Sequence, residues 1–384
     1  MFLPRRLIAT LILSVLNTNV DVMVEHSHDV IVEQSQQAEF RIVTVADGLK
    51  NPWGLAFLPS GDLLLSEWSG GLRLVRDGRV SPTLEGVPPV VSNDGRAAGL
   101  LGIAVHPEFE RNGLIYLCYL HGSMNSNVSR IARGRLTGNA LVDIEVVFEG
   151  DDRAREFHHS GCRLVWADDG RLFATFGDRR HLMSESQNLA STTGTIIRID
   201  DEGAVPDDNP FVGRDDARPE IWAYGLRNVQ GIVLHPATRE LWFSEHGPLG
   251  GDEVNILRRG SNYGWPIATY GIDYDRTIIT EHVQLPGVVG PLFYWRPSTA
   301  PSGLAFYTGE HFPAWRGDLF MGSLADRRLI RMELNGDRIL FQEPLLAELD
   351  RRIRDVVMGP DGYLYLLTDA DPGAVLRLEP LGGN

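Results

Sequence analysis

The sequence has little cysteine, no long basic run and few segments apolar enough for a membrane. Its two cysteines, Cys118 and Cys162, do not have the spacing of a zinc site. The net charge of −15 argues against nucleic acid or an anionic membrane surface as partner. No long apolar stripe has the 3.6-residue period of helices, which disfavours an all-helical fold. After the N-terminal region, no segment has the roughly 20 apolar residues of a membrane span.

The N-terminus has the pattern of a secretory signal. Arg5 and Arg6 precede an apolar run, Leu7–Leu16, that is short for a span and typical of a signal peptide. No small-x-small cleavage motif follows, and a frayed amphipathic terminus is the alternative. We predict a signal peptide and linker over residues 1–38, one domain over residues 39–384, and a periplasmic or secreted location.

One phrase recurs six times along the chain. Each copy has an apolar strand, a turn containing Pro, Asp or Gly, and a second apolar strand, and most copies are followed by a third. Such repetition predicts an all-β fold, a six-bladed β-propeller of four-stranded antiparallel blades. Phe40–Val45 precedes the first copy and is predicted to complete the last blade. The copies are Trp53–Glu67, Leu101–Tyr119, Cys162–Asp178, Gly231–Gly247, Gly303–Ser323 and Asp355–Asp369.

The cysteines fall inside this pattern. Cys118 lies in the strand phrase LIYLCYL and is predicted to be a buried core residue. A disulfide with Cys162 remains open at this point.

Polar residues stand immediately before several predicted inner strands, and these positions meet at one rim of a propeller. His159 is a candidate general base, with a surface histidine as the alternative. Arginines gathered on an acidic protein predict an anionic ligand, unless each pairs with a local acid such as Asp178 or Asp355. The rim arginines are Arg179, Arg227, Arg352 and Arg354, and Asn228 adjoins Arg227.

A turn after one predicted strand is rich in oxygen donors. It runs from Glu245 to Pro248 and is followed by Asp252 and Glu253. Carbonyl and carboxylate oxygens suit calcium, although the spacing is not that of an EF-hand. A hairpin with capping acids is the alternative interpretation.

The phrases NPWGLAFLPSG, GLLGIAVHPEF, RPEIWAYGLRNVQG, SEHGPLGGDEVN and RIRDVVMGPDG carry a resemblance to a known family. The chain resembles the soluble PQQ-dependent aldose sugar dehydrogenases of the glucose/sorbosone dehydrogenase family, which are six-bladed propellers. The resemblance implies an oxidoreductase that oxidises aldoses at C1 to the lactone, with PQQ and calcium.

The resemblance also implies roles for individual residues. His159 matches the catalytic histidine, and Arg227 matches the arginine at the reactive quinone oxygens. Cofactor contacts fall on Arg179, Arg227, Asn228, Arg352 and Arg354. Calcium ligands fall on Gly247 and Pro248, and a second, structural calcium site falls near Asp252, Glu253 and Tyr263.

Two positions depart from the family pattern. Ala97 stands where a glutamine is usual and Ala325 where a lysine is usual, with Arg96 and Arg327 as nearby substitutes. The expected partners are a small sugar and an external electron acceptor, and the chain is expected to be a monomer or homodimer. The alternatives are a non-catalytic or cofactor-impaired propeller and a calcium-dependent lactone hydrolase.

Overall fold

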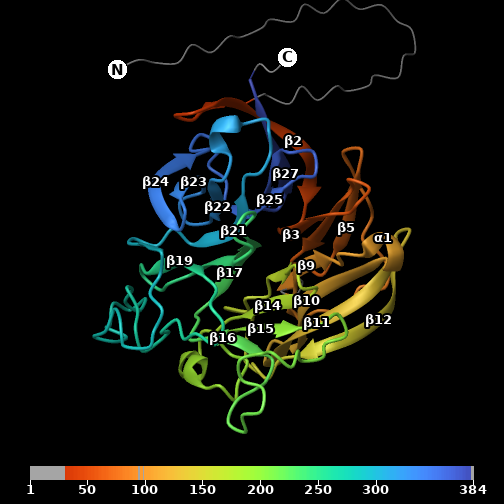
Figure 1. Cartoon of the computed structure of the whole chain (residues 1–384). Helices are drawn as coiled ribbons and strands as arrows, with labels where there is room; N and C mark the ends of the chain where they lie inside the picture. The colour runs from red at the N-terminus through yellow and green to blue at the C-terminus, as the bar shows by residue number, and fades with distance from the viewer. Residues whose placement is uncertain (1–30, 94–95, 98, 382–384) are drawn as a thin grey trace, which may run out of the picture.

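The protein is described by a computed structural model that covers residues 31–93, 96–97 and 99–381. Six sheets surround a central axis, and the chain runs around the ring from the first blade to the last (Figure 1). The innermost strands of neighbouring blades contact each other in sequence, and the last, β25, contacts the first, β3. The predicted all-β, six-bladed propeller of four-stranded antiparallel blades is confirmed.

Each of the first three blades runs outward from its first strand. The first blade is β3 (Pro52–Phe57), β4 (Leu63–Glu67), β5 (Leu72–Arg76) and β6 (Arg79–Val80). The second is β9 (Leu100–Val105), β10 (Leu114–Ser123), β11 (Ser126–Thr137) and β12 (Ala140–Glu149). The third is β13 (Leu164–Trp166), β14 (Leu172–Phe176), β15 (Thr195–Ile199) and β16 (Ile221–Tyr224).

The remaining blades follow the same order. The fourth is β17 (Val229–Leu234), β18 (Leu241–Glu245), β19 (Asp252–Ile256) and β20 (Phe293–Trp295). The fifth is β21 (Pro301–Phe306), β22 (Leu319–Ser323), β23 (Arg328–Asn335) and β24 (Arg338–Leu345). The sixth has β25 (Ile353–Met358), β26 (Leu364–Thr368) and β27 (Gly373–Pro380).

The ring closes with an N-terminal strand. β2 (Glu39–Leu49) pairs antiparallel with β27, with Ile42 opposite Leu378, as predicted for Phe40–Val45. β1 (Ile31–Gln34) then pairs with β2 as a fifth strand. Residues 31–34 therefore belong to the sheet, which differs from the linker predicted there. Residues 1–30, which contain the predicted signal peptide and part of the predicted linker, lie outside the described residues.

Short elements lie between the blades. They are the two-stranded hairpin β7 (Ser92–Asn93) and β8 (Arg96–Ala97), the helix α1 (Phe109–Asn112), and the 3-10 turns η1 (Met183–Gln187) and η2 (Pro313–Trp315). In the described part of the chain, no helix is both long and apolar enough for a bilayer crossing.

The core lies between blades. One cluster joins Trp242 of β18 to Phe306 of β21, whose rings meet edge to face at 5.4 Å. Full burial of a large apolar side chain contributes about 1.5–3 kcal/mol. Because each blade buries its faces against its neighbours, the ring is a rigid support for the loops at its ends.

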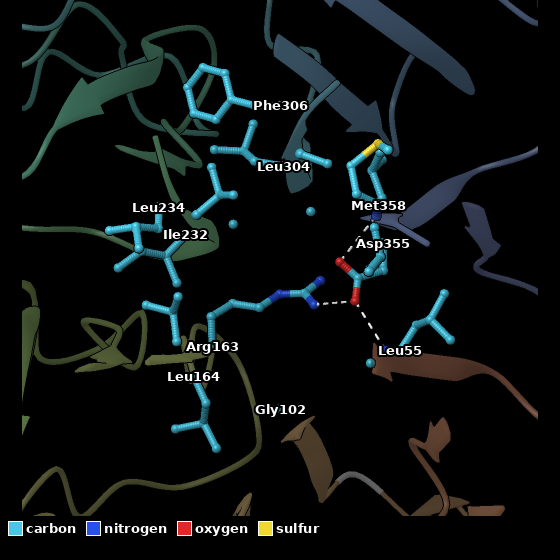
Figure 2. A pocket seen from close by; sticks show the side chains of 18 of the residues that line it. Leu55, Gly102, Arg163, Leu164, Ile232, Leu234, Leu304, Phe306, Asp355 and Met358 are labelled. Atoms are coloured by element: carbon cyan, nitrogen blue, oxygen red, sulfur yellow. Dashed lines mark hydrogen bonds and ion pairs between the residues drawn. The ribbon is translucent and has the colours of Figure 1, made fainter. Parts of the chain in front are cut away.

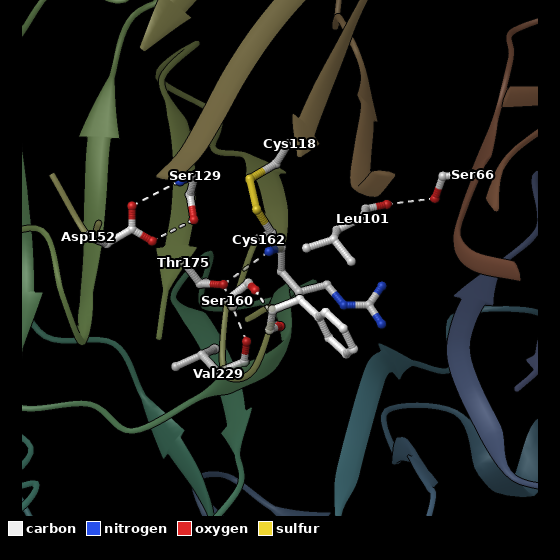
Figure 3. The surroundings of a disulfide bond; sticks show 12 residues. Ser66, Leu101, Cys118, Ser129, Asp152, Ser160, Cys162, Thr175 and Val229 are labelled. Atoms are coloured by element: carbon white, nitrogen blue, oxygen red, sulfur yellow. Dashed lines mark hydrogen bonds between the residues drawn. A yellow bond between two sulfur atoms is a disulfide. The ribbon is translucent and has the colours of Figure 1, made fainter. Parts of the chain in front are cut away.

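A disulfide also joins two blades. Cys118 of β10 is bonded to Cys162, just before β13, and both residues are fully buried (Figure 3). The open question about this pair is thereby answered, and Cys118 is also a core residue as predicted. Cys162 is three residues from His159, so the bond ties the loop that carries this histidine to the second blade.

Candidate functional site

His159 and Asp178 form a hydrogen-bonded pair at one end of the ring. His159 lies before β13 with a positive φ of 49°, and Asp178 follows β14. His159 Nδ1 donates to Asp178 Oδ1 at 2.6 Å, and Trp265 Nε1 donates to Asp178 Oδ2 at 2.8 Å. Because the carboxylate only accepts, it fixes the proton on Nδ1 and leaves the lone pair on Nε2.

Burial favours the neutral imidazole. The His159 side chain is 13% exposed. Its burial lowers the pKa of His159 below the usual value; the hydrogen bond that His159 donates to Asp178 opposes this effect, and the nearby Arg227 guanidinium adds to it. A neutral histidine whose Nε2 is unprotonated is a competent general base at neutral pH.

His159 lies between two cavities. The first, of about 220 Å³, is lined by Arg227, Pro248 and Trp265 among others. The second, of about 230 Å³, is lined by Trp53, Asn228, His246, Arg352 and Arg354 among others. The predicted rim residues His159, Arg227, Asn228, Arg352 and Arg354 thus meet although they lie far apart in sequence.

Arg227 is buried and anchored to the turn after β18. Its backbone N–H donates to Glu245 Oε2 at 2.7 Å. Its Nη1 donates to the carbonyls of His246 at 3.0 Å and Gly247 at 2.8 Å. The guanidinium also stacks over the Trp265 ring, 5.3 Å from its centroid.

Asn228 and His246 form the polar wall of the second cavity. Asn228 Oδ1 accepts hydrogen bonds from the Gly161 N–H at 3.2 Å and from Gln230 Nε2 at 3.1 Å. His246 Nε2 donates to the Pro301 carbonyl at 2.7 Å. Burial, reinforced by nearby cationic groups, lowers the pKa of His246 to about 3, so this imidazole stays neutral.

Arg352 and Arg354 share one carboxylate. Arg352 Nε and Arg354 Nη2 each donate to Asp369 Oδ2 at 2.8 Å. Arg354 is 7% exposed, and its burial lowers the pKa of its guanidinium. Two cations on one carboxylate leave a net positive charge in the second cavity.

Two guanidinium nitrogens of the site lack partners. Within the described residues, Nε of Arg227 and Nε of Arg354 are buried and form no hydrogen bond. A buried donor without a partner costs about 1–3 kcal/mol, which an anionic ligand would offset. The donor set therefore fits a ligand with carboxylate or quinone oxygens.

A further ion pair lies among the inner strands. Arg163 Nη1 pairs with Asp355 Oδ2 at 2.8 Å within a cavity of about 330 Å³ lined by the inner strands (Figure 2). Arg163 also donates to the Gln230 and Arg354 carbonyls, at 2.6 and 2.9 Å. The predicted acid partners of the rim arginines thus have other roles, Asp178 with His159 and Asp355 with Arg163.

The structure does not bring Arg179 to either cavity. Its side chain is fully buried and pairs with Asp152 at 2.9 Å, behind the loop that carries His159. Its neighbour Arg180 lines the first cavity instead. The sequence prediction for Arg179 as a cofactor contact is therefore corrected.

The predicted calcium ligands fall into two groups. The Gly247 carbonyl accepts from Arg227, while Pro248 lines the first cavity. Asp252 is not free for a metal, because its carboxylate accepts from the backbone N–H groups of Gly247, Thr299 and Ala300 at 2.6–2.8 Å.

Glu253 is a buried carboxyl beside a second buried carboxyl. It is opposite Glu245 in the β18–β19 pair, and both carboxyls are buried. Burial raises the pKa of Glu245 to about 7 and that of Glu253 well above its usual value. Asn255 Nδ2 donates to Glu253, whereas its Oδ1 is buried without a partner. A calcium ion beside these oxygens would stabilise both ionised carboxylates.

Tyr263 does not offer its phenol to this site. The Tyr263 hydroxyl donates to the Ile256 carbonyl at 2.6 Å and accepts from the Arg258 N–H at 2.8 Å. Of the described residues, no group of three or more His, Cys, Asp or Glu side chains is arranged as a metal-binding set. Backbone and amide oxygens would have to complete any calcium site here.

The two departures from the family pattern are not compensated by Arg327. Arg327 pairs with Asp350 at 3.2 Å on the surface. Ala325 donates its N–H to the Thr299 carbonyl at 3.0 Å. Ala97 and Arg96 lie in β8, where only the backbone is described.

Residues 49–377 match the family model described as Glucose / Sorbosone dehydrogenase. The chain belongs to this family. It is 40% identical over 350 residues to the aldose sugar dehydrogenase YliI of Escherichia coli, covering 89% of this chain and 94% of that protein.

Solved structures agree with this membership. The apo-form of the soluble aldose sugar dehydrogenase of E. coli matches with a TM-score of 0.84 and 38% identity, covering 89% of this chain and all of that one. The PQQ-bound aldose sugar dehydrogenase of Streptomyces coelicolor matches with a TM-score of 0.72 and 29% identity, covering 89% and 98%.

Proposed function

We propose that this protein is a dehydrogenase that oxidises aldose sugars at C1 to the lactone, with PQQ as hydride acceptor and calcium as a further cofactor. The observation that carries the proposal is the His159–Asp178 pair placed between two cavities, one of them lined by Arg352 and Arg354. Membership of the family and the PQQ-bound relative support it.

Each residue of the site has its own role in the proposed oxidation. Bound PQQ supplies the two-electron acceptor for the hydride that leaves C1. His159 Nε2 takes the proton of the anomeric hydroxyl as the C=O bond forms. Asp178 holds the imidazole in the productive tautomer and stabilises the charge it gains. Arg227 places a fixed positive charge beside His159, where negative charge moves during hydride transfer. An external electron acceptor then takes the electrons.

The second cavity is the proposed PQQ site. Arg352 and Arg354 would bind cofactor carboxylates in fork geometry. Asn228 and His246 are neutral groups that line the same cavity and would orient the ring of the cofactor. The unpaired Nε of Arg354 is a donor that such a ligand would satisfy.

Calcium is proposed at two places. The carbonyls of Gly247 and Pro248 would hold an ion beside the cofactor, where it acts as a Lewis acid. Glu253 with Asn255 Oδ1 would hold a structural ion. Asp252 would support the first place indirectly, because its carboxylate fixes the Gly247 N–H.

We also propose export to the periplasm or beyond. The buried Cys118–Cys162 disulfide supports this location, because disulfides persist in oxidising compartments. The predicted monomer or homodimer remains an expectation.

The test is reconstitution. Purified apo-protein is mixed with PQQ and calcium, and glucose oxidation is assayed with an artificial electron acceptor while the cofactor spectrum is recorded. Turnover with a spectral change on sugar addition supports the proposal. Bound PQQ without turnover would favour a non-catalytic propeller, and lactone hydrolysis with calcium alone would favour a hydrolase.

A further inference from the structure

The cavity beside His159 contains an arginine that has no assigned role in the proposed hydride transfer. Arg180 lines this cavity together with Arg227 and Tyr274. In the part of the chain that is described, no carboxylate lies within 4 Å of its guanidinium, unlike many surface arginines of this protein, such as Arg214 beside Asp216. Arg180 is exposed, so its guanidinium is accessible to a ligand from solvent.

The backbone of Arg180 is hydrogen-bonded to the His159–Asp178 pair. Its backbone N–H donates to Asp178 Oδ1 at 2.7 Å, the oxygen that also accepts from His159 Nδ1. Its φ is 62°, in the left-handed region, so the backbone there is specified by its surroundings. A ligand group bound by Arg180 is therefore placed at a defined position relative to His159.

Tyr274 connects Arg180 with Arg227. The guanidinium carbon of Arg180 lies 5.7 Å from the Tyr274 ring centroid, and that of Arg227 lies 5.8 Å from it. Tyr274 is 50% exposed, so its ring forms the outer wall of the cavity. The two arginines make one end of the cavity positive.

Two acids, Asp178 and Asp273, also line this cavity and balance the formal charge of the two arginines, but neither lies within 4 Å of the Arg180 guanidinium. Asp178 accepts hydrogen bonds from His159 and Trp265. Asp273 is the other acid, and its Oδ1 accepts the Tyr274 N–H. A neutral aldose would leave Arg180 without an anionic partner, whereas an aldose with a carboxylate would supply one.

A third cavity, lined by two arginines, adjoins the first. It has a volume of about 570 Å³, shares His181 with the first cavity, and is lined by Arg153 and Arg155. Arg153 donates to Ser126 Oγ at 3.1 Å, and neither arginine forms an ion pair with a described residue. Glu156 is the acid of this cavity and lies 3.2 Å from His158 Nε2. The positive surface thus continues away from His159.

We propose that the preferred substrates are acidic aldoses, namely uronic acids and the reducing ends of short oligouronides. Arg180 binds the carboxylate of the sugar whose C1 faces His159, and Arg153 and Arg155 bind the next acidic residue. The geometry fits this assignment, because C1 and the carbon that bears the carboxylate both flank the ring oxygen of a uronic acid. The proposal rests on the proposed aldose oxidation and names its substrate class.

The test compares substrates on the holoenzyme. We measure kcat/KM for D-glucose, D-galacturonic acid, a galacturonate disaccharide and glucose 6-phosphate. The wild type is expected to prefer galacturonate to glucose by about tenfold or more, the effect of one charge-assisted hydrogen bond. Preference for glucose 6-phosphate over galacturonate would overturn the carboxylate assignment.

Substitutions show which arginine causes the preference for acidic sugars. R180Q should lower kcat/KM for galacturonate at least about tenfold more than for glucose. R155Q should affect the disaccharide more than the monosaccharide. R316Q, a change of an exposed arginine on the fifth blade, is the matched control and should change neither. Equal losses of R180Q on glucose and galacturonate would contradict the proposal.

A binding measurement separates this proposal from the proposed function. Calorimetric titration of the calcium- and PQQ-loaded protein with D-galacturonate needs no turnover. Binding that R180Q weakens would support the acidic substrate class even if no aldose is oxidised. If the protein oxidises glucose but neither prefers galacturonate nor binds it more tightly, the proposed dehydrogenase function stands. The proposed acidic substrate class is then contradicted.

Discussion

Asp178 holds His159 and Trp265 together, accepting from His159 Nδ1 at 2.6 Å and from Trp265 Nε1 at 2.8 Å. Each oxygen of one buried carboxylate thus fixes one ring. The base and the aromatic wall of the substrate cavity are therefore set by the same residue, which links the tautomer of the histidine to the shape of the cavity.

Replacing Asp178 by Asn should lower kcat by about 10²-fold or more, since the amide no longer enforces the proton on Nδ1 or stabilises the imidazolium. PQQ affinity should change much less. Trp265→Phe, which removes the second hydrogen bond and part of the ring beneath Arg227 but keeps the histidine contact, is the comparison and should cost less in kcat. Steady-state kinetics with PQQ titration of both variants decides this; equal losses in the two would contradict a specific role for the histidine contact.

The pH profile of kcat/KM should report His159 in the free enzyme. Burial lowers the pKa of His159, so its protonated form accumulates only below the ordinary value of 6.5. Activity should therefore be constant at neutral pH and fall with an acid limb that lies below pH 6.5. An acid limb above that value would show that a different group is the base.

The arginine pair should control cofactor affinity more than turnover. Arg354→Met removes a buried donor and leaves Asp369 paired with Arg352 alone, which should raise the Kd of PQQ by about tenfold or more. Fluorescence or absorbance titration measures this effect. Arg351→Met is the control. Arg351 is exposed and lies next to Arg352 in sequence, but it does not line the second cavity.

The number of blades and the grouping of the rim residues could be predicted from the sequence, because each depends on local sequence patterns. Each blade repeats one strand-turn-strand phrase, so the number of copies predicts the number of blades. Residues before inner strands meet at one rim in any propeller, which is why His159, Arg227 and Arg352 could be grouped without a structure.

Other features depend on single side-chain directions that a pattern does not contain. Arg179 and Arg180 are adjacent, yet one is buried against Asp152 and the other faces the cavity. Asp252 has the chemistry of a calcium ligand, but backbone groups at residues 299 and 300 already occupy it. Asp178 directly follows a strand in the same repeat copy, and that signal could have identified it as the partner of His159.

Calcium removal should destabilise the protein through Glu253. A ligand present at 100 times its Kd contributes about 2.7 kcal/mol of stability, so a chelator should lower Tm measurably. Glu253→Gln should make Tm insensitive to the chelator because one carboxylate of the proposed site is lost. Glu310→Gln, a change of an exposed acid, should keep the full response. Calorimetry with and without chelator gives the answer, and an unchanged response in Glu253→Gln would place the ion elsewhere.

The central claim is that His159 acts as the base while an aldose reduces bound PQQ. The most direct measurement is the anaerobic absorbance change of the PQQ- and calcium-loaded protein after one addition of aldose, for the wild type and for His159→Ala. We expect reduction of the cofactor in the wild type, and binding of PQQ with reduction slowed by about 10²–10⁴-fold in the variant. Equal rates in the two proteins, or no PQQ spectrum in the wild type, would contradict the account.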